Sequence, residues 1–228
     1  MTERFFIEFR PWKRKFIREY AEGANRRLIK LGSEKINVPH MTLYGPSEAE
    51  DLDKIARRVR DIAKEFELVK VTAAGFSYFD NADKKWVNIH IKPNQKLEDL
   101  RYKLHQALCK MAPPQPWDAQ PQYKFHVAIA KTTDAYIFNK IRHAVWHWSP
   151  PEIEQFLLRI AIINGHGKIH SEYDLIQKRL LTRREALSHW EQKKTLQGLR
   201  NLLSGRQPYQ QRLSIFDKIG KFFSDLSG

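Results

Sequence analysis

Residues 38–46 read V-P-H-M-T-L-Y-G-P, and their polar side chains set them apart from an ordinary core strand. Met41 and Leu43 are apolar, as a buried strand requires, but His40 and Thr42 interrupt them. Side chains two residues apart in a strand lie on the same face of a sheet. The imidazole of His40 and the hydroxyl of Thr42 therefore point the same way, which predicts a site for chemistry.

A second histidine strand lies in the other half of the chain. Residues 124–131 read K-F-H-V-A-I-A-K, with His126 at the start of a run of small and apolar residues. In both stretches the histidine is followed by an apolar residue, a small residue and a branched apolar residue. The two stretches form a matched pair, one in each half of the chain.

The composition limits the class of protein. The 228 residues are 42% hydrophobic, which suffices for one large domain or two small lobes with a core. The single cysteine, Cys109, excludes an internal disulfide and a cysteine-based zinc cluster. The N-terminus lacks the apolar core of a signal peptide, and no run approaches the length of a membrane span. We expect a soluble, cytoplasmic protein.

The charge is strongly positive and unevenly distributed. Forty Lys and Arg against 26 Asp and Glu give a formal net charge of +14, which favours polyanionic partners such as nucleic acid or an acidic membrane surface. Residues 178–212 contain nine basic and two acidic residues and supply half of this excess. Such a segment is either a solvated helix face or a nucleic-acid contact.

The hydrophobic periodicity predicts a mixed order of strands and helices. Strands are expected near residues 4–9, 40–44, 68–79, 85–91, 123–131, 152–163 and 168–177. Helices are expected at 12–31, from Ser47 to about 66, at 97–111 and at 133–148. Gly45-Pro46 is expected to close the 40–44 strand, and a proline-rich segment after residue 111 predicts a loop. This order is typical of an α+β fold of two similar halves.

The chain from residue 181 onward is expected to form a basic, amphipathic helical extension, 181–228, that follows a main domain of residues 1–180. Thr182 and Glu185 have the spacing of a capping box, and their helix is expected to run to about Leu203. The final segment, 213–226, has apolar residues at helical spacing. It either packs on its own lobe or docks on a partner protein or an acidic membrane surface.

Side by side, V-P-H-M-T-L and K-F-H-V-A-I resemble the two H-x-T/S-x motifs, with x apolar, of the two-histidine (2H) phosphoesterase superfamily. Within it, the sequence is similar to the 2'-5' RNA ligase-like proteins, also described as RNA 2',3'-cyclic phosphodiesterases. The resemblance covers about residues 3–178. It implies a bilobal α+β (LigT-like) fold with two pseudo-symmetric antiparallel sheets, outer helices and both motif strands in a cleft between the lobes.

The resemblance also implies a reaction, the opening of 2',3'-cyclic phosphate ends of RNA to a phosphomonoester, with 2'-5' ligation as its reverse. One group must take a proton from water and another must give one to the departing ribose oxygen. Two imidazoles can do both near neutral pH, so neither a metal nor a cofactor is expected. We expect His40 to be the acid and His126 the base, with the Thr42 hydroxyl bound to the phosphate.

The second motif departs from the family pattern, because Ala128 stands where Thr or Ser is expected. The loss of one such hydroxyl donor can cost roughly two decades in rate. Lys124 and Lys131 are candidate replacements at the phosphate, and Tyr44 is a candidate surface for a nucleobase. The alternative function is a non-catalytic RNA- or nucleotide-binding protein that uses the cleft as a phosphate pocket.

Two further groups of side chains are unusual. Trp86, Asn88 and His90 share one face of a strand, and this face either lines the cleft or is exposed to solvent. Residues 146–148 read W-H-W, a composition to which the sequence alone attaches no mechanism.

Overall fold

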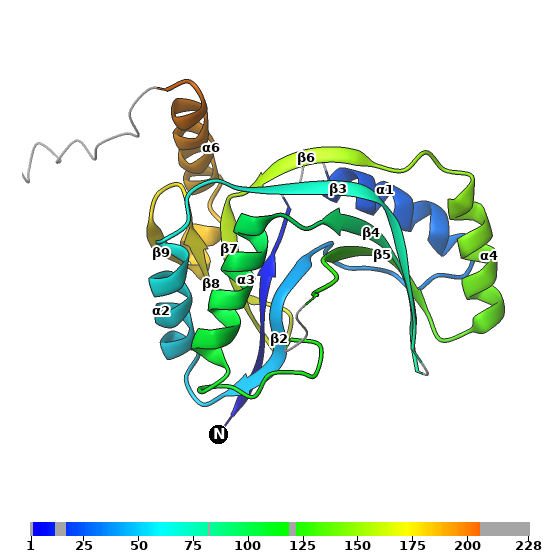
Figure 1. Ribbon diagram of the computed structural model, residues 1–228, viewed down its shortest axis with the longest axis horizontal. Coiled ribbons are helices and arrows are strands. Elements are labelled where there is room, and N and C mark those ends of the chain that lie inside the picture. The colour runs from blue at the N-terminus through cyan, green and yellow to red at the C-terminus, as the bar shows by residue number, and fades with distance from the viewer. Residues whose placement is uncertain (1, 12–16, 82, 119–121, 206–228) are drawn as a thin grey trace, which may run out of the picture.

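The computed structural model describes residues 2–11, 17–81, 83–118 and 122–205. These residues form two antiparallel sheets with helices packed on them (Figure 1). The strand order is β2-β1-β7-β8-β9 in the first, sheet A, and β5-β4-β3-β6 in the second, sheet B. The α+β architecture of two antiparallel sheets with outer helices agrees with the sequence-based expectation.

The two histidine strands lie where the sheets meet. Sheet A comprises β1 (Glu3–Phe9), β2 (Met41–Ala49), β7 (Arg159–Asn164), β8 (Ile169–Asp174) and β9 (Arg179–Thr182). Sheet B comprises β3 (Val69–Asp80), β4 (Lys85–Lys92), β5 (His126–Thr132) and β6 (Glu152–Leu157). Strands β2 and β5 are each at the edge of their sheet, and they contact each other. This arrangement brings the start of one motif strand toward the other.

The helices do not all pack on the sheet to which their neighbouring strands belong. They are α1 (Ile17–Ile29), α2 (Leu52–Ala63), α3 (Gln95–Leu108), α4 (Ala135–Trp146), α5 (Arg183–Ala186) and α6 (His189–Leu203). Helix α2 packs on sheet A with α3 beside it, whereas α1 and α4 pack on sheet B. Helix α1 follows a strand of sheet A but covers sheet B, so each sheet depends on residues from both halves of the chain. None of the described helices is long and apolar enough to cross a membrane.

The helices begin where the sequence supplies capping side chains. Asp51, Asn94 and Asp134 accept backbone N–H groups in the first turns of α2, α3 and α4. These donors have no partner within the helix, so the caps define where each helix starts. The apolar stripe of α2 that the sequence predicts is buried, from Leu52 to Ala63.

Both histidine strands contain a β-bulge at the same distance from the histidine. The register of β2 on β1 shifts between Thr42 and Tyr44, and the register of β5 on β4 shifts between Ala128 and Ala130. The extra residue is therefore the third after the histidine in each strand. A bulge bends its strand and re-aims the side chains beyond it, so the two motifs share their local backbone geometry.

Strand β2 is longer than expected. It continues through Gly45 and Pro46 to Ala49, so the prediction that these two residues close the strand and that Ser47 begins a helix is wrong. Gly45 has a φ of +97°, and a Cβ at this position would lie 3.1 Å from the Phe5 carbonyl oxygen. Glycine therefore allows the strand to stay close to β1 where a side chain would block it.

The chain crosses from sheet B to sheet A at Leu158. Residues 152–163, expected as one strand, form β6 and β7, which belong to different sheets and are separated by this single residue. The sequence has no turn residue at the crossing, because Leu157, Leu158 and Ile160 are apolar and only Arg159 interrupts them.

The expected boundary between residues 180 and 181 falls within β9, which pairs with β8. Two helices, α5 and α6, replace the single helix expected to end near Leu203. The capping box of Thr182 and Glu185 is present at α5. The apolar segment 213–226 lies outside the described residues.

A buried hydrogen-bond network fixes α6 to sheet A. The guanidinium of Arg159 on β7 donates to the Asp174 carboxylate at 3.1 Å and to the Thr195 hydroxyl of α6 at 2.6 Å. It also donates to the Glu191 carbonyl at 2.9 Å. Asp174 and Thr195 are both 0% exposed. Since breaking one partner of a buried charged network is costly, α6 is an integral part of this lobe.

Candidate active site

His40 and His126 hold their rings in the same way. Nδ1 of His40 lies 2.9 Å from the carbonyl oxygen of Val38, and Nδ1 of His126 lies 2.8 Å from that of Lys124. A carbonyl oxygen can only accept, so Nδ1 carries the hydrogen in both rings. The backbone two residues before each histidine thus leaves Nε2 as the nitrogen for proton transfer. In both predicted catalytic histidines, Nε2 is therefore the nitrogen available for proton transfer.

The two motifs are tied together across the junction of the sheets. The hydroxyl of Tyr123, which lies just before β5, donates to the carbonyl oxygen of Thr42 on β2 at 3.2 Å. The edge strands β2 and β5 contact each other at this junction. Side chains also bind the backbone near the two bulges: Asn25 donates to the Ile129 carbonyl at 2.9 Å, and Asp118 accepts the N–H of Gly45 at 3.2 Å. These bonds fix both motif strands in place.

His126 lies in surroundings that favour its neutral form. Its ring packs on that of Phe79 in a T-shaped arrangement, with 4.7 Å between the centroids and an angle of 89° between the planes. His90 lies opposite it in the register of β4 and β5. Burial lowers the pKa of the His126 imidazole below its ordinary value, and the positive charges of His40 and His90 lower it further, against the opposing hydrogen bond to the Lys124 carbonyl. A neutral imidazole is the form that accepts a proton.

His40 lies beside a carboxylate. Its Nε2 is 3.5 Å from Oε1 of Glu8, a residue that is 3% exposed. The other carboxylate oxygen of Glu8 accepts from Nε of Arg10 at 3.0 Å. Glu8 forms an ion pair with His40 whenever that ring is protonated, whereas the neighbours of His126 are an aromatic ring and a second histidine.

Glu8 is a site residue that the sequence analysis missed. It lies opposite Thr42 in the register of β1 and β2, which places its side chain on the motif face of sheet A. The signal was its charge within the otherwise apolar run F-F-I-E-F, residues 5–9. The pairing of the two strands, which decides what this charge faces, is not visible in that run.

Thr42 occupies the place expected of a phosphate ligand. It is half-buried on the same face as Glu8, and its hydroxyl forms no hydrogen bond with the part of the chain that the structure describes. A hydroxyl in this condition can donate to a bound anion without breaking an existing bond.

Ala128 leaves polar groups without partners beside it. It lies opposite Asn88 on β4, and Asn88 lies opposite Ser77 on β3. Asn88 is 0% exposed, so this part of the face shared with Trp86 and His90 is buried and does not face solvent. Among the described residues, Oδ1 of Asn88 and Oγ of Ser77 are buried without a hydrogen-bond partner. A buried polar atom in this state is unusual, and here two of them share the row of the missing motif hydroxyl.

Tyr44 does not reach the site, and its predicted role at a nucleobase is wrong. Its side chain is 0% exposed, and its hydroxyl donates to the Ala112 carbonyl at 2.6 Å. Strict alternation from His40 and Thr42 would put Tyr44 on the motif face. The bulge at Leu43 turns it to the opposite face, where its ring stacks on Phe5.

The two lysines differ in their surroundings. Lys124 is exposed and contributes its carbonyl to His126. The ammonium of Lys131 lies 2.9 Å from the Glu34 carboxylate and 5.9 Å from the centroid of the Trp86 ring, so its charge is already paired. Their role as phosphate ligands stays a prediction. Within the described ranges, no group of three or more His, Cys, Asp or Glu side chains is placed to hold a metal ion.

His40 lies just before β2, an edge strand of sheet A, and His126 begins β5, an edge strand of sheet B. Residues 11–164, which include both histidine strands, match the 2'-5' RNA ligase superfamily, and the chain belongs to this family. The resemblance found in the two histidine motifs is thereby confirmed. A search of curated proteins by sequence finds no match.

Solved structures with a similar fold share little sequence with this chain. Usb1 of Kluyveromyces marxianus is 12% identical, with 71% of this chain and 92% of that chain covered and a TM-score of 0.43. Escherichia coli LigT complexed with 3'-AMP is 10% identical, with 78% of this chain and 92% of that chain covered and a TM-score of 0.45.

Proposed function

We propose that this protein opens 2',3'-cyclic phosphate ends of RNA by acid–base catalysis between His40 and His126, with neither a metal ion nor a cofactor. Membership of the 2'-5' RNA ligase superfamily supports a phosphoesterase that acts on RNA ends. The single observation that carries the proposal is the matched pair of Nδ1–carbonyl hydrogen bonds. They leave two Nε2 atoms for the two proton transfers that ring opening requires.

The two transfers are assigned by the surroundings of the rings. Nε2 of His126, held neutral by burial, takes a proton from water as the water oxygen bonds to phosphorus. The bond from phosphorus to one ribose oxygen breaks, and Nε2–H of His40 gives that oxygen its proton. The Glu8 carboxylate lies 3.5 Å from Nε2 of His40, the atom that gives the proton. The product is a phosphomonoester beside a free hydroxyl. When a ribose hydroxyl of a second RNA attacks the phosphorus in place of water and the bond from phosphorus to the 3' oxygen breaks, the same two proton transfers give a 2'-5' phosphodiester, which is ligation.

The Thr42 hydroxyl donates to a non-bridging phosphate oxygen and stabilises the charge that develops there. It is the one hydroxyl that the two motifs supply, because Ala128 has none. Lys124 and Lys131 are the cations that we assign to the remaining phosphate oxygens.

A short RNA that ends in a 2',3'-cyclic phosphate tests the proposal. The wild-type protein should convert it to a monophosphate in the presence of EDTA, followed by chromatography of the product. The variants His40→Ala and His126→Ala should each lose about 10²–10⁴-fold in kcat, the range of general acid–base catalysis. His166→Ala, which alters an exposed histidine in the turn between β7 and β8, is the matched control and should keep the wild-type rate. Wild-type protein that leaves the ring closed would refute the proposal.

A non-catalytic RNA- or nucleotide-binding protein is the second candidate, and the absence of a hydroxyl at Ala128 is the observation that favours it. In this function the same histidines and Thr42 hold a terminal phosphate without turning it over. The same experiment separates the two functions when RNA binding is measured alongside turnover. Binding without ring opening, weakened in both histidine variants, would establish the second function.

A further inference from the structure

The W-H-W stretch at residues 146–148 lies between two hollows in the surface. The first, of about 460 Å³, is lined by Tyr78, Asn139, Arg142, His143, Trp146 and His147. The second, of about 710 Å³, is lined in part by Tyr20, Arg27 and Trp148. The volumes fall within the roughly 300–1,000 Å³ typical of small-ligand sites. One indole of the stretch borders each hollow.

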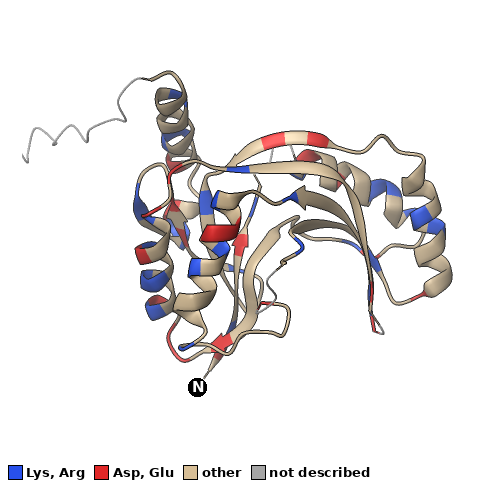
Figure 2. Cartoon of the chain, in the orientation of Figure 1, with Lys and Arg blue, Asp and Glu red and all other residues tan. Residues whose placement is uncertain are grey.

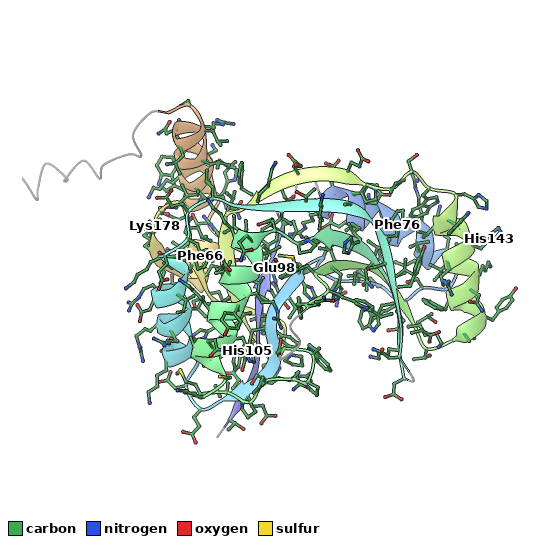
Figure 3. The ribbon with its side chains drawn as sticks, viewed as in Figure 1. Phe66, Phe76, Glu98, His105, His143 and Lys178 are labelled. Atoms are coloured by element: carbon green, nitrogen blue, oxygen red, sulfur yellow. The ribbon has the colours of Figure 1, made fainter. Side chains whose placement is uncertain are left out.

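The first hollow combines exposed rings with a cation. Trp146 is 80% exposed although its indole is the largest apolar side chain of the protein alphabet. The guanidinium carbon of Arg142 lies 5.1 Å from the centroid of the Tyr78 ring, and the rings of His143 and His147 lie 4.9 Å apart. His143 lies on α4, at the end of the molecule opposite α2 (Figure 3).

The second hollow repeats this combination. The guanidinium carbon of Arg27 on α1 lies 5.8 Å from the centroid of the Trp148 ring. Trp148 packs in turn against Phe76, with 6.4 Å between the ring centroids, and is thereby held in place. Each hollow therefore pairs an indole with a guanidinium.

This chemistry fits a ligand that is both flat and anionic. Indole, phenol and imidazole rings stack on the faces of unpaired bases, and guanidinium groups stack on bases or bind phosphates. Lys and Arg residues occur on both α1 and α4 (Figure 2), in a protein of net charge +14. Unpaired RNA has both properties, whereas an apolar docking helix of a partner protein would gain nothing from the two guanidinium groups.

A single strand links the first hollow to the histidine site. Tyr78 lines the hollow, while the next residue of β3, Phe79, contacts the ring of His126. Neighbouring residues of a strand point to opposite faces of the sheet. The hollow and the site are therefore on the two faces of the same part of β3, and RNA that occupies both must pass round an edge of sheet B.

We propose that the two hollows bind unpaired nucleotides of the RNA whose end occupies the histidine site, with bases stacked on Trp146 and Trp148. The identity of that RNA end rests on the proposed function, but the hollows and their preference for unpaired RNA do not. The site would add affinity for longer RNA without taking part in the reaction.

Fluorescence anisotropy with labelled single-stranded RNA of about 12 nucleotides, within the site sizes of single-strand binders, tests the proposal. Trp146→Ala should raise the Kd at least about fivefold, the lower end of what one base–aromatic stack contributes. Arg27→Gln, which alters the second hollow, should also raise the Kd and make binding less sensitive to salt. Tyr102→Ala is the matched control, because it removes a 61% exposed ring on α3 and should leave the Kd unchanged.

The turnover of a mononucleotide 2',3'-cyclic phosphate should be the same in Trp146→Ala and in the wild type, because so small a substrate does not extend to the hollows. The proposal would be overturned if Trp146→Ala and Arg27→Gln both kept the wild-type Kd for RNA. It would also be overturned if Tyr102→Ala raised the Kd as much as they do. The binding measurement needs no turnover. If the wild-type protein left the cyclic phosphate closed, the proposed function would be refuted. A lower RNA affinity in Trp146→Ala would still support RNA binding at the hollows.

Discussion

The two histidine strands share a backbone but differ in their surroundings. In both, Nδ1 of the histidine is bound by the carbonyl two residues earlier, and a bulge follows at the third residue after the histidine. Next to His40 are the Glu8 carboxylate and the Thr42 hydroxyl. Next to His126 are the Phe79 ring and the methyl side chain of Ala128. The two rings therefore differ in their neighbouring side chains and not in the backbone that holds them.

The neighbouring strands therefore supply the difference between two similar motifs. Glu8 comes from β1, which pairs with β2, and Phe79 and His90 come from β3 and β4 of the other sheet. A carboxylate favours a charged ring, whereas burial and like charge favour a neutral one. This difference is the basis on which we propose His40 as the acid and His126 as the base.

The largest expected effect separates the acid from the base. A nucleoside p-nitrophenyl phosphate has a leaving group that departs without a proton, so it needs no general acid. His40→Ala should lose about 10²–10⁴-fold on a cyclic phosphate but much less on the p-nitrophenyl ester, whereas His126→Ala should lose a similar factor on both. Release of p-nitrophenolate, followed by absorbance, gives both rates. If the p-nitrophenyl ester instead restored the rate of His126→Ala, the assignment of acid and base would be reversed.

Glu8→Gln provides a graded version of the same comparison. It removes the negative charge beside His40 without changing the size of the side chain, and we expect a loss of about tenfold on the cyclic phosphate, equivalent to about 1.4 kcal/mol. The loss should be smaller on the p-nitrophenyl ester, as for His40→Ala. Equal losses on the two substrates would mean that Glu8 supports the fold rather than the acid.

The next effect concerns the hydroxyl that one motif has and the other lacks. Thr42→Val should lower kcat by about 10²-fold, as expected for one donor to a developing anionic oxygen. Ala128→Ser should raise it, by up to the same factor, because it places a hydroxyl in the row of Asn88 and Ser77, whose polar atoms have no partner among the described residues. Single-turnover rates measure both. An unchanged rate in Ala128→Ser would show that another group already acts as the second donor.

The smallest effect is a shift of the pH profile. Burial and, to a lesser degree, the charges of His40 and His90 lower the pKa of His126 from its ordinary 6.5. Because the base works in its neutral form, the acid limb of the kcat/KM profile should lie below pH 6.5. His90→Gln removes one like charge, so the pKa of His126 rises and the acid limb moves to higher pH. A shift toward lower pH would contradict this account of the site.

Local patterns in the sequence were sufficient to predict most elements of the fold. The stripe from Leu52 to Ala63 and the Thr182 capping box depend on neighbours within one or two turns, and both are present. The errors fall where contacts distant in sequence decide the structure. β1 keeps β2 extended through Gly45 and Pro46, and the change of sheet at Leu158 depends on two different partner strands.

The site was predictable to the same extent. His40, Thr42 and His126 lie within short patterns, and His90 lies on a strand face that the sequence left either lining the cleft or exposed. Glu8 and Phe79 reach the candidate site only through contacts between strands distant in sequence, which a single sequence does not show. Tyr44 was misplaced for a related reason. Period-two alternation holds only in a regular strand, and the bulge at Leu43 interrupts it.

The packing of α1 on sheet B, although it follows a strand of sheet A, has a consequence for how the chain folds. Helix α1 packs against β5, and the Asn25 side chain binds the carbonyl of Ile129, a residue made about a hundred positions later at ribosomal rates of roughly 5–20 residues per second. The first half therefore emerges with a helix whose main partner strand, β5, has not yet been made. Two fragments divided within the proline-rich loop would each lack part of a hydrophobic layer, and both would have to be present before either could assemble.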